Sequence, residues 1–290
     1  MRVALHGKNF SEQSIPVMRT IFDRIVRYSS KIFLSERYAK VLHYRGIKLP
    51  LAGTFGRGNL PECDAIITLG GDGTLLDTVT YVGSSETPIL GINTGRLGFL
   101  ATIPINKFSE TFKRIQEGDY RIDERSLLSL RTPENFFLNQ NFALNEFTVT
   151  KKDSSSMITV RAFINDEYIN SYWADGLIVA TPTGSTGYSM SCGGPLLHPA
   201  SNNFVITPVS PHHLNVRPLI IPDNSEIRLE IESRSRNVLI SLDSRSQSIP
   251  YQTEIKLKKE SFGVKLIHLN DYSFYDTLRG KLNWGMDLRN

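Results

Sequence analysis

The amino-acid sequence predicts a chain of two parts, an α/β region built on a parallel sheet followed by an all-β region of sandwich character. In the first hundred residues, short apolar runs alternate with stretches of helical periodicity. After about residue 120, short strand-like runs follow one another, and helical spacing returns only near the C-terminus. We therefore expect a Rossmann-like α/β domain at residues 1–118, joined by about 271–290, and a β-sandwich domain at residues 119–270.

The elements of the first part follow from its hydrophobic pattern. Apolar residues from Val17 to Val26 recur at helical spacing, as they do more briefly at 38–44 and 74–81. The run at 64–69 is apolar apart from Asp64 and Thr68, which is typical of a strand buried on both faces. Further strands are expected at 3–5, 31–34 and 88–92. The alternation of strand and helix is the signature of a parallel sheet covered by helices.

The second part reads as a series of strands. Ile227, Leu229 and Ile231 alternate with charged residues, as expected for a strand with one buried face. Similar short runs occur at 127–130, 142–149, 157–164, 177–180, 205–207 and 238–242. The segment 274–282 returns to helical spacing, and we expect this helix to pack back on the first domain.

Composition excludes several classes of protein. The 290 residues are 40% hydrophobic and 21% charged, with a net charge of +4, which is ordinary for a globular protein. Lys and Arg are spread along the chain, so a nucleic-acid partner is not expected. Cys63 and Cys192 form no metal-binding motif, so neither structural zinc nor a disulfide framework is expected. No apolar run approaches the length of a membrane span, and we expect a cytoplasmic protein with no membrane partner.

The strongest chemical feature is the glycine loop, residues 70–74. Gly70, Gly71 and Gly73 follow a buried strand, and Thr74 opens a helix. Glycines let a ligand approach the backbone, and a helix N-terminus attracts phosphate. Asp72 would repel phosphate, so it is better suited to accept a proton from a hydroxyl or to hold a metal ion that holds phosphate. The alternative is a simple turn in which Asp72 caps the helix. The spacing matches neither a P-loop nor a Rossmann fingerprint.

A second glycine-containing segment, residues 181–195, is rich in Gly, Ser, Thr and Pro. Hydroxyls and free N–H groups at this density suit phosphate and ribose oxygens, although a long surface loop would have the same composition. Asn145 and Glu146 lie within the strand-like run at 142–149. An adenine edge could satisfy this buried polar pair, and a solvent-facing strand end explains it about as well. Asp243 and Arg245 are similarly ambiguous.

Several segments together resemble the NAD kinase family. They are Leu69–Thr74, Gly91–Leu100, Asn145–Glu146, Asp175–Gly176, Thr181–Ser191, Pro211–His212, Arg217–Leu219 and Leu278–Gly285, in the order in which the family has them. Lipid kinases and phosphofructokinases share the glycine loop. The segment from Thr181 to Tyr188 is far more specific to NAD kinases. The resemblance spans roughly residues 60 to 285.

The resemblance implies that NAD binds between the two domains and that the ATP γ-phosphoryl group is transferred to the 2′-hydroxyl of its adenosine ribose, giving NADP. Asp72 would be the general base. Asn145 and Glu146 would hold the adenine side of NAD, and Asp175 its nicotinamide-side ribose or amide. The remaining NAD-binding residues would be Asp72 itself, Gly73, Thr186, Gly187, Tyr188, Ser189, Met190, Ser191 and Arg245. Gly70, Gly71, Gly73 and Thr74 would bind the phosphates of ATP.

The resemblance also implies Mg²⁺ bound with ATP, no metal ligated by the protein alone, and a homodimer or homotetramer. Polyphosphate could replace ATP as donor. Two residues depart from the family pattern: Arg245 stands where many relatives carry Gln, and Trp173 stands where basic residues are common. Two other classes stay open. A lipid kinase would phosphorylate a lipid hydroxyl, but the sequence has no membrane-surface helix. A nucleotide sensor would bind NAD without turnover, although Asp72 is intact.

Overall fold

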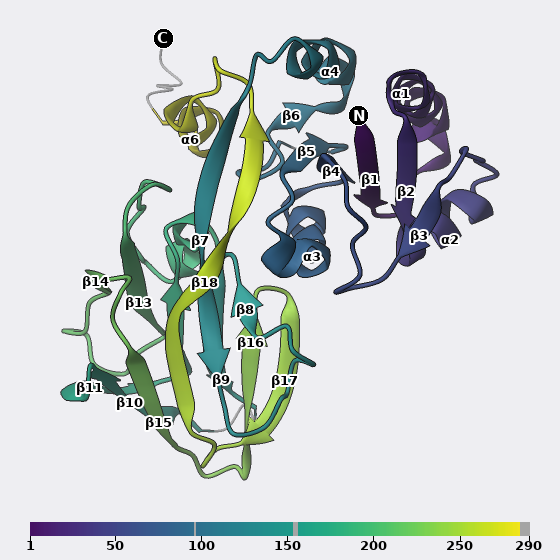
Figure 1. Ribbon diagram of the computed structural model, residues 1–290. Coiled ribbons are helices and arrows are strands. Elements are labelled where there is room, and N and C mark those ends of the chain that lie inside the picture. The colour runs from purple at the N-terminus through teal and green to yellow at the C-terminus, as the bar shows by residue number, and fades with distance from the viewer. Residues whose placement is uncertain (96, 153–155, 285–290) are drawn as a thin grey trace. The chain divides into compact units, whose positions relative to one another are not determined.

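The computed structural model describes residues 1–95, 97–152 and 156–284, and the chain forms two compact units (Figure 1). Unit 1 comprises residues 1–124 together with the segment from residue 264 onward, and unit 2 comprises residues 125–263. Arg96 and Gly285, which belong to the motifs quoted above, lie outside the described residues. In the described part of the chain, no helix has the length and apolar character needed to span a membrane.

Unit 1 is built on a parallel sheet with the strand order β5-β4-β1-β2-β3. These strands are β5 (Ile89–Asn93), β4 (Ala65–Leu69), β1 (Arg2–Gly7), β2 (Lys31–Ser35) and β3 (Gly53–Phe55). The short β6 (Ile103–Pro104) is parallel to β5 at its far side. In β1 and β4, Gly7 pairs with Leu69, so the two strands end side by side where the glycine loop begins.

Helices cover both faces of this sheet. One face packs against buried residues of α1 (Ile15–Tyr28), α2 (Glu36–Tyr44) and α4 (Phe108–Gln116). On the opposite face, the Thr68 hydroxyl donates to Thr78 of α3 (Asp72–Val82) at 2.8 Å. The segment from Val264 to the end of α6 (Phe274–Leu282) also belongs to unit 1. The expectation of a C-terminal helix packed on the α/β domain is therefore confirmed.

Unit 2 is a sandwich of antiparallel strands. One sheet has the order β14-β13-β12-β9-β16-β17, and its strands are β14 (Leu219–Pro222), β13 (Asn203–Val209), β12 (Gly176–Ala180), β9 (Glu146–Lys151), β16 (Asn237–Leu242) and β17 (Arg245–Pro250). The other contains β11 (Glu167–Ala174), β10 (Ile158–Ile164), β15 (Ile227–Glu232) and β8 (Phe142–Ala143), together with the parts of β18 (Ile255–His268) and β7 (Arg121–Arg131) that fall within residues 125–263. Val179 and Ile240 of the first sheet share a core with Val160 and Leu229 of the second. The predicted β-sandwich is confirmed.

Several elements lack a clear signal in the sequence, and one predicted strand is longer than any strand observed there. The sequence pattern did not predict helix α4 or strands β3, β6, β11, β14, β17 and β18, although β18 is 14 residues long. The predicted strand at 142–149 is wrong as a single element, because the chain leaves the sheet at Leu144 and Asn145 between β8 and β9. Asp243 causes this break, as described below.

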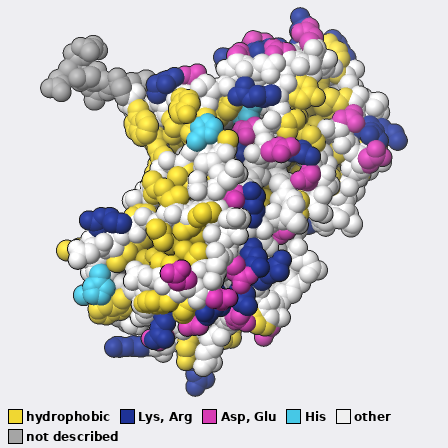
Figure 2. Space-filling view, turned by 60° about the vertical axis from the view of Figure 1, so that its left-hand side comes forward, with side chains coloured by type: hydrophobic (Ala, Val, Ile, Leu, Met, Phe, Trp, Pro, Cys, Tyr) yellow, Lys and Arg dark blue, Asp and Glu magenta, His cyan; other side chains and the backbone are white. Residues whose placement is uncertain are grey.

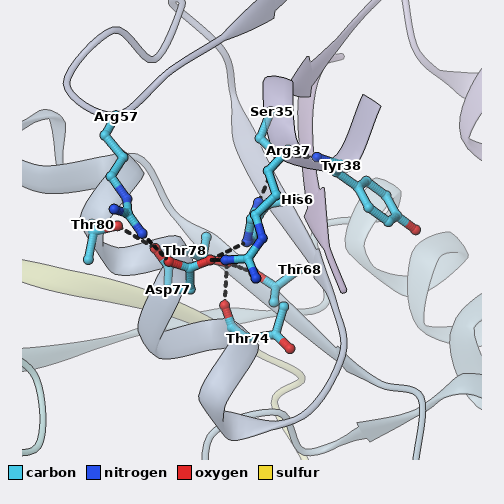
Figure 3. A network of polar contacts seen from close by, with 10 residues as sticks. All are labelled: His6, Ser35, Arg37, Tyr38, Arg57, Thr68, Thr74, Asp77, Thr78 and Thr80. Atoms are coloured by element: carbon cyan, nitrogen blue, oxygen red, sulfur yellow. Dashed lines mark hydrogen bonds and ion pairs between the residues drawn. The ribbon is translucent and has the colours of Figure 1, made fainter. Parts of the chain in front are cut away.

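A partly buried polar network fastens α3 to its neighbours (Figure 3). The carboxylate of Asp77 accepts hydrogen bonds from His6 Nε2 at 3.1 Å, Arg37 at 3.2 Å and Arg57 at 2.7 Å. His6 is completely buried, and its Nδ1 lies 2.7 Å from the hydroxyl of Ser35. Burial alone would raise the pKa of Asp77, but the bonds from His6 and Arg57 lower it well below its ordinary value. Three separate chain segments are therefore tied to the helix that begins in the glycine loop.

Replacing Asp77 by alanine is expected to destabilise the protein by about 2 kcal/mol, because the buried Nε2 of His6 loses its hydrogen-bond partner. The folded pKa of Asp77 is depressed, so its contribution is present above the unfolded pKa near ~4 and is lost as pH falls through the folded value. Denaturant unfolding at pH 7 and at successively lower pH measures both effects. The exposed Asp23→Ala variant is the control. Equal unfolding midpoints for the two variants at pH 7 would contradict the assignment.

Candidate active site

The glycine loop joins β4 to α3 without a side-chain cap. Helix α3 begins at Asp72, and Gly71 occupies the N-cap position. The interpretation of Asp72 as a cap for a helix starting near Thr74 is therefore wrong. Thr74 is 1% exposed, and its hydroxyl oxygen would lie 2.2 Å from a Cβ added at Gly70. Only glycine leaves room for this hydroxyl at position 70, so the loop closes tightly around Thr74.

The carboxylate of Asp72 is held by a row of backbone N–H groups. Oδ2 accepts from Phe99 N at 2.7 Å, and Oδ1 accepts from Leu100 N and Ala101 N, each at 3.0 Å. A carboxylate offers about four lone-pair sites, so three bonds leave one site, on Oδ2. Asp72 is only partly buried, and that site can receive a hydroxyl from a substrate.

Gly98 makes this arrangement possible. A Cβ added at Gly98 would lie 1.8 Å from Asp72 Oδ1, far inside van der Waals contact. Gly98 N also donates to Ala101 O at 3.4 Å, which shapes the turn that presents the three N–H groups. The segment 98–101 thus receives the side chain of Asp72 at close range and fixes its direction.

In unit 2, a second aspartate organises the chain around Asn145 in a similar way. Asp243, at a left-handed φ of 52°, accepts from Leu144 N at 3.0 Å, Asn145 N at 2.7 Å and Glu146 N at 3.2 Å. These three N–H groups therefore face a carboxylate rather than a neighbouring strand. That is the physical reason for the break between β8 and β9, and it places Asn145 and Glu146 at the end of a strand.

Asn145 and Glu146 present buried polar atoms without partners. Among the described residues, Asn145 Oδ1 and Glu146 Oε2 have no hydrogen-bond partner. A Cβ added at Gly187 would lie 2.9 Å from Glu146 Oε2 and 3.6 Å from Asn145 Nδ2, so the pair lies close against Gly187. Burial raises the pKa of Glu146 to about 8, and the negative charge of Asp243 adds to this effect. At neutral pH, Glu146 therefore carries a proton and can donate a hydrogen bond.

The raised pKa of Glu146 predicts a pH-dependent stability. The folded pKa of about 8 lies above the unfolded value of ~4.3, so the folded state binds more protons between these limits. Stability from this group is full below pH ~4 and falls as pH rises toward 8. We expect Glu146→Gln, which keeps a neutral side chain at every pH, to lose less stability between pH 6 and pH 9 than the wild type. Thermal unfolding at both pH values measures this, and equal losses would contradict it.

The segment Thr181–Ser191 is not a surface loop. It contains a 3₁₀ helix (Thr183–Thr186) and the short α5 (Tyr188–Ser191), and its buried polar residues are Thr181, Thr183, Ser185 and Ser189. Most of its buried hydroxyls have internal partners: Thr181 donates to Leu144 O at 2.5 Å, and Ser189 lies 2.8 Å from the Thr207 hydroxyl. These hydroxyls fix the segment beside Asn145 instead of facing solvent. Tyr188 and Ser191 are exposed, and Thr186, Gly187 and Met190 are half-buried.

The two remaining candidate residues have partners within unit 2. Asp175 forms an ion pair with Lys151 at 2.7 Å. Arg245 donates to Gln140 O at 2.6 Å and to Phe142 O, and its guanidinium lies within 5.9 Å of the ring centres of Phe137 and Phe142. These contacts fix the orientation of both side chains.

Comparison with known proteins identifies the family. The sequence matches the ATP-NAD kinase N-terminal domain over residues 59–120 and the ATP-NAD kinase C-terminal domain over residues 144–269. It is 48% identical to an NAD kinase of Cytophaga hutchinsonii and 43% identical to one of Flavobacterium psychrophilum, each over 100% of both chains. The chain belongs to the ATP-NAD kinase family. The expectation of an enzyme of this family is confirmed.

Solved structures of kinases share the fold. Yeast NADH kinase complexed with NADH superposes with a TM-score of 0.86 at 24% identity, covering 100% of this chain and 89% of that one. An NAD kinase from Archaeoglobus fulgidus in complex with ATP has a TM-score of 0.72 at 23% identity, covering 98% and 99%. At these identities the comparison establishes the two-part ATP-NAD kinase fold alone.

Three features of this ATP-NAD kinase family member were missed from the sequence. The N–H groups of residues 99–101 hold Asp72, Asp243 holds the chain at Asn145, and Arg125, only 3% exposed, donates to the Thr183 hydroxyl at 3.2 Å. Only Asp243 carried a sequence signal, an aspartate directly after an alternating strand. The glycine loop lies in unit 1, and Asn145, Glu146, Asp175, Arg245 and the Thr181–Ser191 segment lie in unit 2.

Proposed function

We propose that the protein transfers the γ-phosphoryl group of ATP to the 2′-hydroxyl of the adenosine ribose of NAD, giving NADP and ADP. The observation that supports this proposal most directly is the carboxylate of Asp72, which accepts three backbone N–H bonds and keeps one lone-pair site on Oδ2. A carboxylate oriented in this way can take a hydroxyl proton without losing its position. The names of the relatives supply the substrate class.

In the proposed reaction, Asp72 accepts the proton of the 2′-hydroxyl as its oxygen bonds to the γ-phosphorus. The bond between that phosphorus and the β–γ bridging oxygen breaks, and ADP leaves. Phosphoryl transfer depends on positioning and charge neutralisation more than on covalent chemistry. The N–H groups of residues 99–101 orient the base, while Gly70, Gly71, Gly73 and Thr74 receive the phosphates at the N-terminus of α3.

The residues present fit a Mg²⁺ ion that arrives with the nucleotide. The described residues contain no group of three or more His, Cys, Asp or Glu side chains placed to hold a metal. Asp72 is the one carboxylate of the glycine loop, and its remaining lone-pair site is assigned to the 2′-hydroxyl, so the ion would be held by phosphate oxygens of ATP and by water. The ion, when bound, neutralises charge on the β- and γ-phosphates.

We further propose that unit 2 binds NAD through the unpartnered atoms of Asn145 and Glu146. The amide oxygen of Asn145 accepts and the protonated carboxyl of Glu146 donates, which matches the paired donor and acceptor of an adenine edge. The same NAD-binding surface would include Gly187, Tyr188, Met190 and Ser191. Asp175 would contact the nicotinamide side of NAD. Ser189 and Arg245 would support this surface through the contacts described above, and Thr186 would do so through its hydroxyl, which donates to Thr183 O at 3.2 Å.

The test is a coupled assay of purified protein with NAD, ATP and Mg²⁺ that reads NADP. Phosphate at the 2′ position is verified by a dehydrogenase specific for NADP. Formation of NADP that requires ATP supports the proposal, and parallel assays with inorganic polyphosphate and with NADH establish the donor and acceptor range. Binding of NAD without any product would identify a nucleotide sensor instead. We also propose a homodimer or homotetramer, which analytical ultracentrifugation tests.

A further inference from the structure

Lys8 lies beside the glycine loop, although nothing in its sequence context indicated a function. The residue follows β1, and its N–H donates to Leu69 O at 3.3 Å, at the end of β4. This contact fixes the backbone of Lys8 next to the point where the chain enters the loop. A Cβ added at Gly73 would lie 3.3 Å from Lys8 Nζ, so the ammonium group lies over the first turn of α3.

The ammonium group of Lys8 forms no ion pair with the residues that the structure describes. Within the described ranges, no carboxylate lies within ion-pairing distance of its ammonium group, and the side chain is exposed. Glu12, the nearest acid in sequence, forms an ion pair with Arg45 at 3.8 Å, and Asp72 of the glycine loop directs its carboxylate to the N–H groups of residues 99–101. The positive charge of Lys8 and the positive end of the α3 dipole therefore lie together at the first turn of the helix. The combination favours an anionic ligand.

An unsatisfied hydroxyl indicates the same place independently. Thr74 Oγ1 is buried and has no hydrogen-bond partner among the described residues. It lies inside the loop, 2.2 Å from the position of a Cβ added at Gly70. A Cβ added at Gly71, by contrast, would meet nothing within 4 Å, so the loop is open on that side. A buried hydroxyl without a partner normally costs free energy, and a ligand oxygen that enters the loop would supply the partner.

We propose that Lys8 binds the terminal phosphates of the nucleoside triphosphate and places the γ-phosphoryl group over the glycine loop. This proposal rests on the proposed kinase function. Lys8 contributes a compact point charge on a flexible stem, which can follow the phosphoryl group as its negative charge redistributes. It exchanges no proton, so its role is to bind and position the donor.

The experiment compares wild type, Lys8→Met and Lys8→Arg in steady-state kinetics with ATP and NAD varied separately. Lys8→Met is expected to lower kcat/KM for ATP by about 10- to 100-fold while KM for NAD stays within about 3-fold. Lys8→Arg keeps the charge and is expected to retain most activity. The exposed Lys48→Met variant is the matched control, because it makes the same chemical change away from the loop.

Direct binding separates this proposal from the function on which it rests. Isothermal titration of tripolyphosphate and of ATP without NAD is expected to give at least 10-fold weaker binding to Lys8→Met than to wild type. If the wild type makes no NADP, the proposed kinase function is wrong, but the titrations still show whether Lys8 binds phosphate. An unchanged kcat/KM for ATP would overturn the proposal, and so would a rise in KM for NAD as large as the rise in KM for ATP. Unchanged binding of tripolyphosphate would overturn it as well.

Discussion

Replacing Asp72 by asparagine is expected to lower kcat for NADP formation by about 10²- to 10⁴-fold, the usual contribution of a general base. Asparagine has nearly the same shape, but its amide cannot take up a proton. Its oxygen can still accept from Leu100 N and Ala101 N, whereas its NH₂ group would face Phe99 N, where Oδ2 now accepts. The side chain therefore remains in the loop with two of its three hydrogen bonds. NAD binding, which we assign to unit 2, should change little.

The measurement pairs steady-state kinetics with NAD titration for Asp72→Asn and for Asp23→Asn. Asp23 is exposed on α1, so its variant makes the same chemical change at a distance from the loop. We expect wild-type kinetics for the control. A kcat of Asp72→Asn within about 3-fold of wild type would exclude Asp72 as the base. Equal loss of activity and of NAD binding would indicate a structural role for the carboxylate.

The space-filling view agrees with one inference drawn from composition. On the face shown in Figure 2, Lys and Arg side chains are interspersed with Asp and Glu side chains, and no single basic patch stands out. The sequence showed the same distribution, because its 33 basic and 29 acidic residues are mixed along the chain. Net charge was therefore uninformative about the ligand. The ion pairs of individual residues say more about the ligand, because Asp77 neutralises two arginines while Lys8 has no counterion among the described residues.

Hydrophobic period and turn residues were sufficient to predict the fold class. The continuous apolar run before Gly70 is fully buried as β4, and the alternating run at 227–231 forms β15 with one face buried. Strand β18 was missed because charged residues such as Lys258, Lys259 and Glu260 interrupt its alternation, and only pairing with other strands makes it a strand. Helix α4 lay in a stretch where no motif drew attention, although its apolar spacing is helical.

The candidate site was predictable in its residue types but not in its geometry. Asp72 and Asn145–Glu146 stand out because polar residues beside buried strands need partners. The partners themselves are backbone N–H groups, which every residue carries, so no pattern in the sequence distinguishes Phe99 or Leu144 as donors. Long-range contacts of this kind depend on the folded chain. The same is true of Lys8, whose position over Gly73 follows from the pairing of β1 with β4.

The geometry at Gly98 leads to the second prediction of large effect. Gly98→Ala is expected to lower kcat by about 10²-fold, because a Cβ 1.8 Å from Asp72 Oδ1 must displace the carboxylate, and a misplacement of about 1 Å can cost that much. The φ of Gly98 lies outside the left-handed region, so alanine fits the backbone and only the side-chain conflict remains. Gly95→Ala is the control, because a Cβ there meets nothing within 4 Å.

A double-mutant cycle shows whether this effect passes through Asp72. In an Asp72→Ala background the carboxylate is absent, and the methyl group that Gly98→Ala introduces can occupy the vacated space. We therefore expect Gly98→Ala to cost about 100-fold in the wild type but less than about 3-fold in Asp72→Ala, a strong departure from additivity. Equal losses in the two backgrounds would mean that the turn at residues 98–101 acts on another part of the site. The cycle thus separates the position of the base from the base itself.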